Sequence, residues 1–219
     1  MLKIENIYYR YKNSNRDVLT DVNADFDPGK LHSIVGPSGS GKTTMLSIMA
    51  GLDRPSKGSI AINGQNLADM DLDQYRRQSI SMIFQAFQLF PLLNARENVC
   101  LPMQMEGKPI RDAQIKAESL LNSVGIDKTK HRRYPSNLSG GEQQRVAIAR
   151  ALGTGAKVIL ADEPTGNLDK ANGEAVISIL KNLAHEEGYC IIIVTHNLEV
   201  AEQSDSVYRM SDGILTKAG

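Results

Sequence analysis

One short segment of this sequence combines glycines with a lysine and a threonine at a spacing suited to binding phosphate. Residues 36–43 match the pattern GxxxxGK[ST]. Glycines let successive backbone N–H groups turn toward phosphate oxygens, and a helix that begins at the end of the loop adds partial positive charge. We expect Lys42 to contact the outer phosphates of a nucleoside triphosphate and the Thr43 hydroxyl to bind Mg²⁺. The loop alone does not separate kinases, GTPases and transport ATPases, although the GTPase reading lacks an NKxD-like segment for the base.

Two adjacent carboxylates follow the apolar run 158–161, in the manner of a Walker B element. We expect Asp162 to hold the metal, and Glu163 to act as the general base that polarises the attacking water. A capping Asp-Glu-Pro turn at the end of a strand is the alternative. His196 follows the run 190–195 in the same way and can contact a γ-phosphate, although a lone histidine is usually structural.

A second segment places a serine and two glycines at the start of a helical pattern. It runs Leu138-Ser-Gly-Gly-Glu142 and is followed by residues 143–150. Such a helix N-terminus can bind an anion. Only the first loop carries a lysine, so the two phosphate-binding helix ends together suggest a site that a partner molecule completes. The alternative is an ordinary N-cap followed by glycines that bind no ligand.

Short apolar runs alternate with helical patterns, which predicts βα units and a mostly parallel sheet. We predict strands over residues 31–35, 59–62, 81–84, 158–161, 190–195 and 206–210. The runs 157–161 and 190–194 do not alternate polar with apolar residues, so both are expected to be central strands. A helix is expected over residues 172–186, with Val176, Ile177, Leu180 and Leu183 on one face and Gly188 after its end.

The strand signal disappears between residues 86 and 156. Residues 111–124 instead place Ile115, Leu120, Leu121 and Val124 at roughly helical spacing. We therefore predict a single domain over residues 1–219, with a core made of 1–85 and 157–219 and an inserted helical subdomain over 86–156.

The composition excludes several classes of protein. The 219 residues carry 25 basic and 25 acidic side chains, and this balance argues against a nucleic-acid partner. The longest apolar run, residues 189–194, is far shorter than the roughly 20 residues of a membrane-spanning helix. The N-terminus is charged by its third residue and does not resemble a secretory signal, so the cytosol is expected. Cys100 and Cys190 form no metal or redox motif, and we expect both to be buried.

Four segments occur in the order found in ATP-binding cassette (ABC) transporter ATPases. GPSGSGKT resembles the Walker A motif, LSGGEQQR the signature motif, ILADEPTGNLD the Walker B motif with the D-loop, and VTHN the H-loop. The resemblance spans essentially the whole chain. It implies an α/β fold: a P-loop NTPase core with a parallel sheet flanked by helices, an N-terminal antiparallel β portion and an inserted α-helical subdomain. It also implies a homodimer that forms on ATP binding and holds two ATP, each between the Walker A motif of one subunit and the signature motif of the other.

The resemblance assigns roles to single residues. Tyr11 would stack on adenine, with Tyr8 and Tyr9 close by in the sequence; an ordinary tyrosine at a strand edge is the alternative. Gln85 in IFQAFQ would contact Mg²⁺ and sense the transporter, and Ser139 and Gly141 would donate to the γ-phosphate across the dimer. The expected catalytic residues are Lys42, Glu163 and His196, and the expected metal ligands are Thr43, Gln85 and Asp162. The expected nucleotide contacts are Tyr11, Gly36, Pro37, Ser38, Gly39, Ser40, Gly41, Lys42, Thr43, Thr44, Gln85, Ser139, Gly140, Gly141, Glu142, Asp169 and His196.

Within the family, the segments 51–55, 98–102 and 161–169 look most like the branch of MacB-type and LolD-type ATPases, with the FtsE type close by. Two positions depart from the commoner pattern, Glu142 in place of glutamine and Asn197 in place of aspartate, and neither removes a catalytic group. The resemblance implies a separate integral membrane permease, which would hold this subunit at the cytoplasmic face of the cell membrane.

Other functions compete with this reading. An FtsE-like regulator of cell-wall hydrolysis would share every motif. A soluble ABC ATPase that acts on DNA or ribosomes usually carries two cassettes or a long coiled-coil insertion. A small-molecule kinase would leave the LSGGE segment unexplained. Nothing in this sequence identifies the cargo or the direction of transport.

Overall fold

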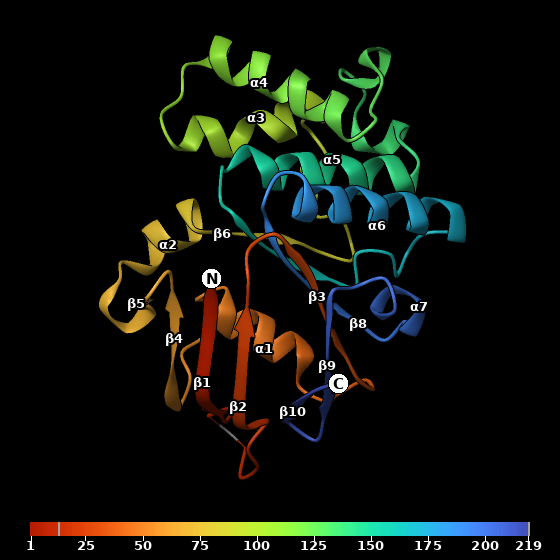
Figure 1. Cartoon of the computed structure of the whole chain (residues 1–219). Coiled ribbons are helices and arrows are strands. Elements are labelled where there is room, and N and C mark those ends of the chain that lie inside the picture. Colours follow the sequence, from red (N-terminus) through yellow and green to blue (C-terminus); the bar gives the residue numbers. More distant parts are fainter. Residues whose placement is uncertain (13, 219) are drawn as a thin grey trace.

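The computed structural model describes residues 1–12 and 14–218, which form two β-sheets with helices around them (Figure 1). The larger sheet has six strands in the order β10-β9-β3-β8-β7-β6. Its strands pair in parallel except for β10, which runs antiparallel to β9. Their bounds are β3 Lys30–Val35, β6 Ile80–Ile83, β7 Val158–Asp162, β8 Cys190–Thr195, β9 Ser206–Ser211 and β10 Ile214–Lys217. The predicted parallel sheet and its central strands are confirmed.

The central strands are apolar on both faces because helices cover both. Along β8, Ile191 and Ile193 belong to one apolar cluster, and Ile192 and Val194 belong to the other. Helix α1 (Lys42–Met49) packs in the second cluster, whereas α5 (Gly140–Gly153) and α6 (Lys170–His185) pack in the first. Figure 1 shows α1 on one side of the sheet and α5 with α6 on the other. The period-two alternation of side chains therefore assigns these helices to opposite faces.

The smaller sheet is antiparallel and has the order β2-β1-β4-β5. Its strands are β1 Leu2–Tyr9, β2 Leu19–Phe26, β4 Lys57–Ile62 and β5 Gln65–Asn66. The predicted strand 59–62 lies here rather than in the parallel sheet. Register shifts interrupt β1, and Asn6 and Asp21 adopt positive φ, so the apolar alternation of β1 and β2 is broken and gave no strand prediction.

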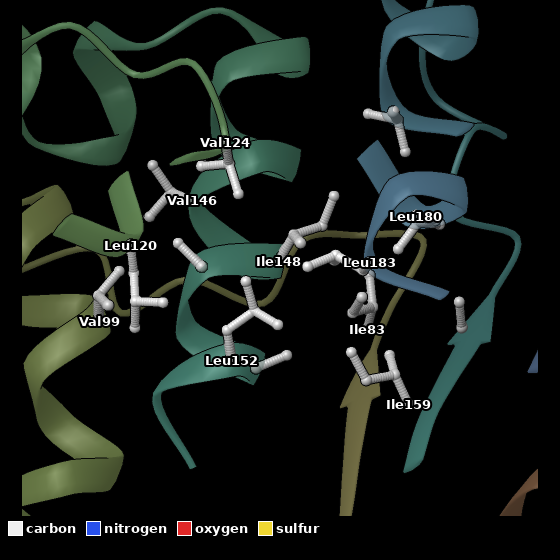
Figure 2. Close-up of a cluster of buried hydrophobic side chains, with 14 of the residues drawn as sticks. Ile83, Val99, Leu120, Val124, Val146, Ile148, Leu152, Ile159, Leu180 and Leu183 are labelled. Atoms are coloured by element: carbon white, nitrogen blue, oxygen red, sulfur yellow. The ribbon is translucent and has the colours of Figure 1, made fainter. Parts of the chain in front are cut away.

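Three helices follow β6: α3 (Ala95–Met105), α4 (Ile110–Ser123) and α5. Figure 2 shows their side chains in one cluster, with Val99, Leu120 and Val146 on one side of it and Leu180 and Ile159 on the other. The core–subdomain division stays a prediction, since this cluster joins the helices to the sheet. The helix expected over residues 111–124 is confirmed as α4, although Ile115, which shares the helical spacing of Leu120 and Leu121, is 62% exposed. Ala113 and Ala117 are buried instead, because small side chains let α4 pack closely.

The helix predicted over residues 172–186 is confirmed, and the other elements not yet described are short. That helix is α6, which buries Val176, Ile177, Leu180 and Leu183, and Gly188 follows it with φ 71°. The short elements are η1 Leu67–Asp69, α2 Leu72–Gln78, η2 Lys128–Lys130, η3 Pro135–Asn137 and α7 Leu198–Ala201. Cys100 and Cys190 are both buried, as expected. Among the described residues, no helix combines the length and the apolar character needed to span a bilayer.

Candidate functional site

The parallel register brings several predicted residues to one edge of the larger sheet. Val35 at the end of β3 pairs with Thr195 at the end of β8, and Val194 pairs with Asp162 at the end of β7. The loop 36–41 leaves β3 at this edge and leads into α1. Ligands of open α/β sheets bind where the carboxyl ends of parallel strands meet. This edge is therefore the candidate site.

The loop over residues 36–41 requires glycine at three positions, because of its backbone conformation or a close neighbouring strand. Gly39 and Gly41 have φ of 77° and 108°, in the region that L side chains disfavour. A Cβ on Gly36 would lie 2.1 Å from the Met210 carbonyl oxygen. The neighbouring strand β9 thus passes too close to Gly36 for any side chain, and the loop must carry glycine at all three positions.

The polar atoms of this loop suit an anionic ligand. Lys42 is buried, and its Nζ donates to the carbonyl oxygens of Gly36 at 2.8 Å and Pro37 at 2.9 Å. The Ser40 Oγ is buried and has no hydrogen-bond partner among the described residues. A lysine whose partners are only carbonyl oxygens and an orphaned buried hydroxyl are groups that a phosphate would satisfy.

The three predicted metal ligands all offer oxygen. Thr43 is exposed at the start of α1, Asp162 ends β7, and Gln85 follows β6 at the same edge of the sheet. Hydroxyl, carboxylate and amide oxygens are the hard ligands that Mg²⁺ takes in proteins. Burial and the neighbouring charge of Glu163 raise the pKa of Asp162, and Lys42 opposes this effect. These side chains fit a divalent cation beside the phosphate loop.

Glu163 is held in an unusual conformation. Its φ is 47°, and its N–H donates to the Val194 carbonyl oxygen at 2.9 Å. The Thr195 hydroxyl donates to Oε2 at 3.2 Å, and His196 Nδ1 donates to Oε1 at 2.8 Å. Two consecutive residues, the last of β8 and the one that follows it, therefore orient both carboxylate oxygens. Thr195 lies in the VTHN segment, but no role was predicted for it, because a residue at the end of an apolar strand resembles a core residue.

Gln85 is tied to the segment that follows Glu163. The Asn167 Nδ2 donates to the Gln85 carbonyl oxygen at 2.9 Å, and the Gln85 Nε2 donates to Asn167 Oδ1 at 3.5 Å. A Cβ on Gly166 would lie 2.7 Å from the Gln85 Nε2. Just beyond Gln85, the guanidinium of Arg150 donates to the carbonyl oxygens of Phe87 and Gln88. Asn167 lies inside the ILADEPTGNLD segment and Arg150 in the helix after the signature motif, but their contacts with the Gln85 loop carry no sequence signal, since both lie far from Gln85 along the chain.

Tyr11 lies beside the start of α1. Its hydroxyl is 2.9 Å from the Thr44 Oγ1, its ring meets Tyr9 edge to face, and the residue is 49% exposed. Tyr8 lies instead next to Lys57, whose Nζ is 5.7 Å from the ring centroid. Of the two, Tyr11 has the geometry to offer an aromatic face beside the phosphate loop.

The signature segment belongs to a separate group of residues. Ser139 caps α5 in a capping box with Glu142, and Asp169 caps α6 through the Asn172 N–H at 2.9 Å. A Cβ on Gly141 would lie 2.1 Å from the Asn172 Oδ1, so the two helix N-termini adjoin. Helices α5 and α6 cover the face of the sheet opposite α1. The structure thus brings 36–44, 162–163 and His196 to one edge of the sheet, with Tyr11 beside Thr44, and groups 139–142 with Asp169 at two adjoining helix N-termini. The Gln85 loop lies between the two groups, since Gln85 bonds to Asn167 and Phe87 lies next to Gly140.

Comparisons with known proteins agree with these motifs. The ABC transporter family model matches residues 19–166. The lipoprotein-releasing system ATP-binding protein LolD 1 of Rhodopirellula baltica is 44% identical over 92% of this chain and 89% of its own. The macrolide export ATP-binding/permease protein MacB of Shewanella sp. (strain ANA-3) is 46% identical over 90% of this chain, which spans 30% of MacB.

Solved structures resemble the whole fold. The dimeric structure of MJ0796, described as a bacterial ABC transporter cassette, has a TM-score of 0.88 and 38% identity over 100% of both chains. A second dimeric structure of MJ0796 is described as a post-hydrolysis state bound to ADP and phosphate. The family match and these identities lead to one conclusion: the chain belongs to the ABC transporter family, as an ATP-binding subunit of the branch that includes MacB and LolD.

Proposed function

We propose that this protein binds and hydrolyses ATP as a homodimer that forms on ATP binding and drives a separate integral membrane permease. The observation that carries the proposal is the separation of two phosphate-binding helix ends. The loop before α1 and the N-terminus of α5 belong to helices on opposite faces of one sheet. One nucleotide can contact both only if a second copy supplies the second end. The dimeric MJ0796 cassettes support this arrangement.

In the proposed dimer, residues 36–43 of one subunit bind the phosphates and Tyr11 stacks on the adenine. Ser40 supplies a buried hydroxyl without a hydrogen-bond partner among the described residues, and Lys42 supplies a positive charge that only carbonyl oxygens of the loop now contact. Thr43, Gln85 and Asp162 hold Mg²⁺, which when bound offsets charge on the β- and γ-phosphates. Ser139, Gly141 and Asp169 of the second subunit complete the site.

Hydrolysis requires a base directed at water next to the γ-phosphate. We assign this role to Glu163, because its carboxylate is oriented through both oxygens and stands next to the proposed metal ligand Asp162. His196 serves both as a γ-phosphate contact and as a hydrogen-bond partner that orients Glu163. Lys42→Ala is expected to abolish nucleotide binding, since it removes the charge that faces the phosphates.

A groove next to Gln85 supports a permease partner. The groove has a volume of about 390 Å³ and is lined mainly by apolar residues, among them Leu52, Phe84, Phe90 and Met105. Leu52, Phe90 and Met105 are exposed, and Arg150 links the groove to the carbonyl oxygens of Phe87 and Gln88. A permease segment seated here would sense the Gln85 loop. It would also hold the subunit at the cytoplasmic face of the membrane.

The names of the relatives suggest the kind of work involved. LolD 1 is named for lipoprotein release and MacB for macrolide export. We propose a transporter of this MacB/LolD type, coupled to export or to mechanical work on a partner, with ATP and Mg²⁺ as ligands and no nucleic-acid partner. The permease selects the cargo.

The test is light scattering after size-exclusion chromatography on the Glu163→Gln protein. We expect a monomer without nucleotide and a dimer with ATP and Mg²⁺, because blocked hydrolysis traps the closed state. Lys42→Ala on the same background should stay monomeric. A Glu163→Gln protein that stays monomeric with ATP, both alone and together with its permease, contradicts the shared site.

A further inference from the structure

The N-terminus of α5 carries a carboxylate in its first turn. Glu142 Oε2 accepts a hydrogen bond from the Ser139 N–H at 2.8 Å, and the Ser139 Oγ accepts one from the Glu142 N–H at 3.3 Å. The Glu142 side chain is 12% exposed. A poorly hydrated negative charge therefore lies next to the segment that is proposed to receive the γ-phosphate of ATP.

A lysine from outside the signature motif pairs with this carboxylate. The Lys130 Nζ forms an ion pair and hydrogen bond with Glu142 Oε1. This pairing is the largest cause of the lowered pKa of Glu142. Glu142 is thus ionised and neutralised by a single partner, with its other oxygen committed to the backbone.

The segment that carries Lys130 is held in place by buried contacts. Its neighbour His131 is buried, and His131 Nε2 donates to the Ile126 carbonyl oxygen at 3.0 Å. The Arg96 N–H donates to the His131 carbonyl oxygen at 2.9 Å. Asp127 caps the turn through the Thr129 N–H at 2.8 Å. The backbone at Lys130 is therefore held on both sides, and the Lys130 side chain is only 33% exposed.

The first amides of α5 remain free to bind an anion. Throughout residues 1–12 and 14–218, no hydrogen bond is donated by the Gly140 N–H or the Gly141 N–H. Glu142 is the next residue, so an unpaired carboxylate there would oppose the approach of phosphate to these amides. Lys130 cancels this charge without occupying either N–H group.

We propose that Lys130 is a positioning residue that neutralises Glu142 so that the N-terminus of α5 can accept the γ-phosphate of ATP bound to the other subunit. The inference rests on the proposed ATP-dependent dimer. The charge that Glu142 introduces at the start of α5 is then balanced by the lysine that ends η2.

The test measures the ATP concentration that gives half-maximal dimer, by light scattering, for variants on the Glu163→Gln background. Lys130→Met keeps the aliphatic stem and removes the charge. We expect it to raise this concentration by about fivefold to tenfold at low salt, because an uncompensated carboxylate then faces the phosphate. Added salt should shrink the difference, because ions screen the repulsion.

Two further variants distinguish the charge of Lys130 from its packing. Lys130→Arg should match the parent within about twofold. The double variant Lys130→Met, Glu142→Gln should recover to within about twofold of Glu142→Gln alone, because neither protein has a charge to balance. Thermal unfolding of each variant without nucleotide verifies that the fold is intact.

A Lys130→Met protein that dimerises at the parent ATP concentration overturns the inference and leaves the proposed function intact. A double variant as weak as Lys130→Met also overturns it, because Lys130 would then act through packing. A parent that never dimerises with ATP contradicts the proposed function, and the inference with it.

Discussion

His196 Nδ1 lies 2.8 Å from Oε1 of Glu163 and donates a hydrogen bond to it. Thr195, the preceding residue, holds the other oxygen of the same carboxylate. Glu163 itself adopts φ 47°, a conformation that costs energy for a residue with a side chain. The end of β8 therefore orients a strained acidic residue at the edge of the sheet.

Glu163→Gln should lower the rate of ATP hydrolysis by about 100-fold or more while ATP still binds, because the amide cannot accept a proton. The measurement is phosphate release at saturating ATP with Mg²⁺ and no phosphate acceptor. The exposed Glu187→Gln is the matched control and should retain the wild-type rate. Hydrolysis by Glu163→Gln at the wild-type rate would show that the base is another group.

His196→Ala should reduce kcat by about 100-fold with a much smaller change in KM, because the lost group acts on the reacting phosphate and on the orientation of Glu163. Steady-state kinetics separates the two constants. His185→Gln, which changes the histidine beside Asp205, is the control. A large rise in KM with unchanged kcat would contradict an orienting role and point to ground-state binding alone.

Asp162→Asn should stabilise the nucleotide-free protein. Burial holds the pKa of Asp162 above its usual range, so its favourable contribution to folding exists at low pH and is lost as pH rises through that pKa. At neutral pH the charged carboxylate is therefore destabilising. We expect the melting temperature of the variant to be about 2 °C or more above that of the wild type at pH 7. Below about pH 4, where both forms of the protein carry a neutral group at this position, we expect the two melting temperatures to be equal.

The same variant should lose Mg²⁺-dependent hydrolysis, since a metal ligand is gone. Calorimetry at several pH values, with the exposed Asp69→Asn as control, tests the stability part of this prediction. An Asp162→Asn protein that melts below the wild type at pH 7 would mean that the carboxylate is stabilised rather than strained in the folded chain.

Tyr11→Ala should raise the Kd for ATP about tenfold, since stacking of a base on an aromatic ring contributes about 1–3 kcal/mol. Tyr11→Phe should bind nearly as well as wild type, because it keeps the ring and loses only the contact with Thr44. Tyr8→Ala is the control for a neighbouring ring. Fluorescence titration with a labelled ATP gives the three constants; a stronger effect at Tyr8 would transfer the assignment there.

Gly36→Ala should destabilise the fold by about 4 kcal/mol or more, because overpacking against backbone belongs to the severe class of mutations. The new Cβ would meet the Met210 carbonyl oxygen at 2.1 Å. Gly64 has positive φ, but a Cβ there meets nothing within 4 Å, so Gly64→Ala should cost only about 1 kcal/mol. Urea unfolding of both variants gives the comparison, and equal costs would contradict the close approach of β9 to the loop.

Local chemistry in the sequence was enough to predict much of the site. Phosphate binding by residues 36–43 depends on glycines, a lysine and a threonine that are consecutive in the chain, and a strand and a helix flank them as expected. The central strands could likewise be predicted from the sequence, because a strand that is buried on both faces needs an uninterrupted apolar run such as residues 190–194.

Other features depended on contacts between distant segments. The family resemblance implied an antiparallel β portion, but the broken alternation in β1 left its strands without a local signal. Ile115 has helical spacing yet faces solvent, whereas the small residues Ala113 and Ala117 are buried. No local pattern marks the contacts of Asn167 and Arg150, since each binds a loop more than 60 residues away. Lys130 and Glu142 are 12 positions apart and meet because the fold brings the end of η2 to the start of α5. Sequence spacing records neighbours along the chain, whereas these pairs exist only once the tertiary structure has brought the segments together.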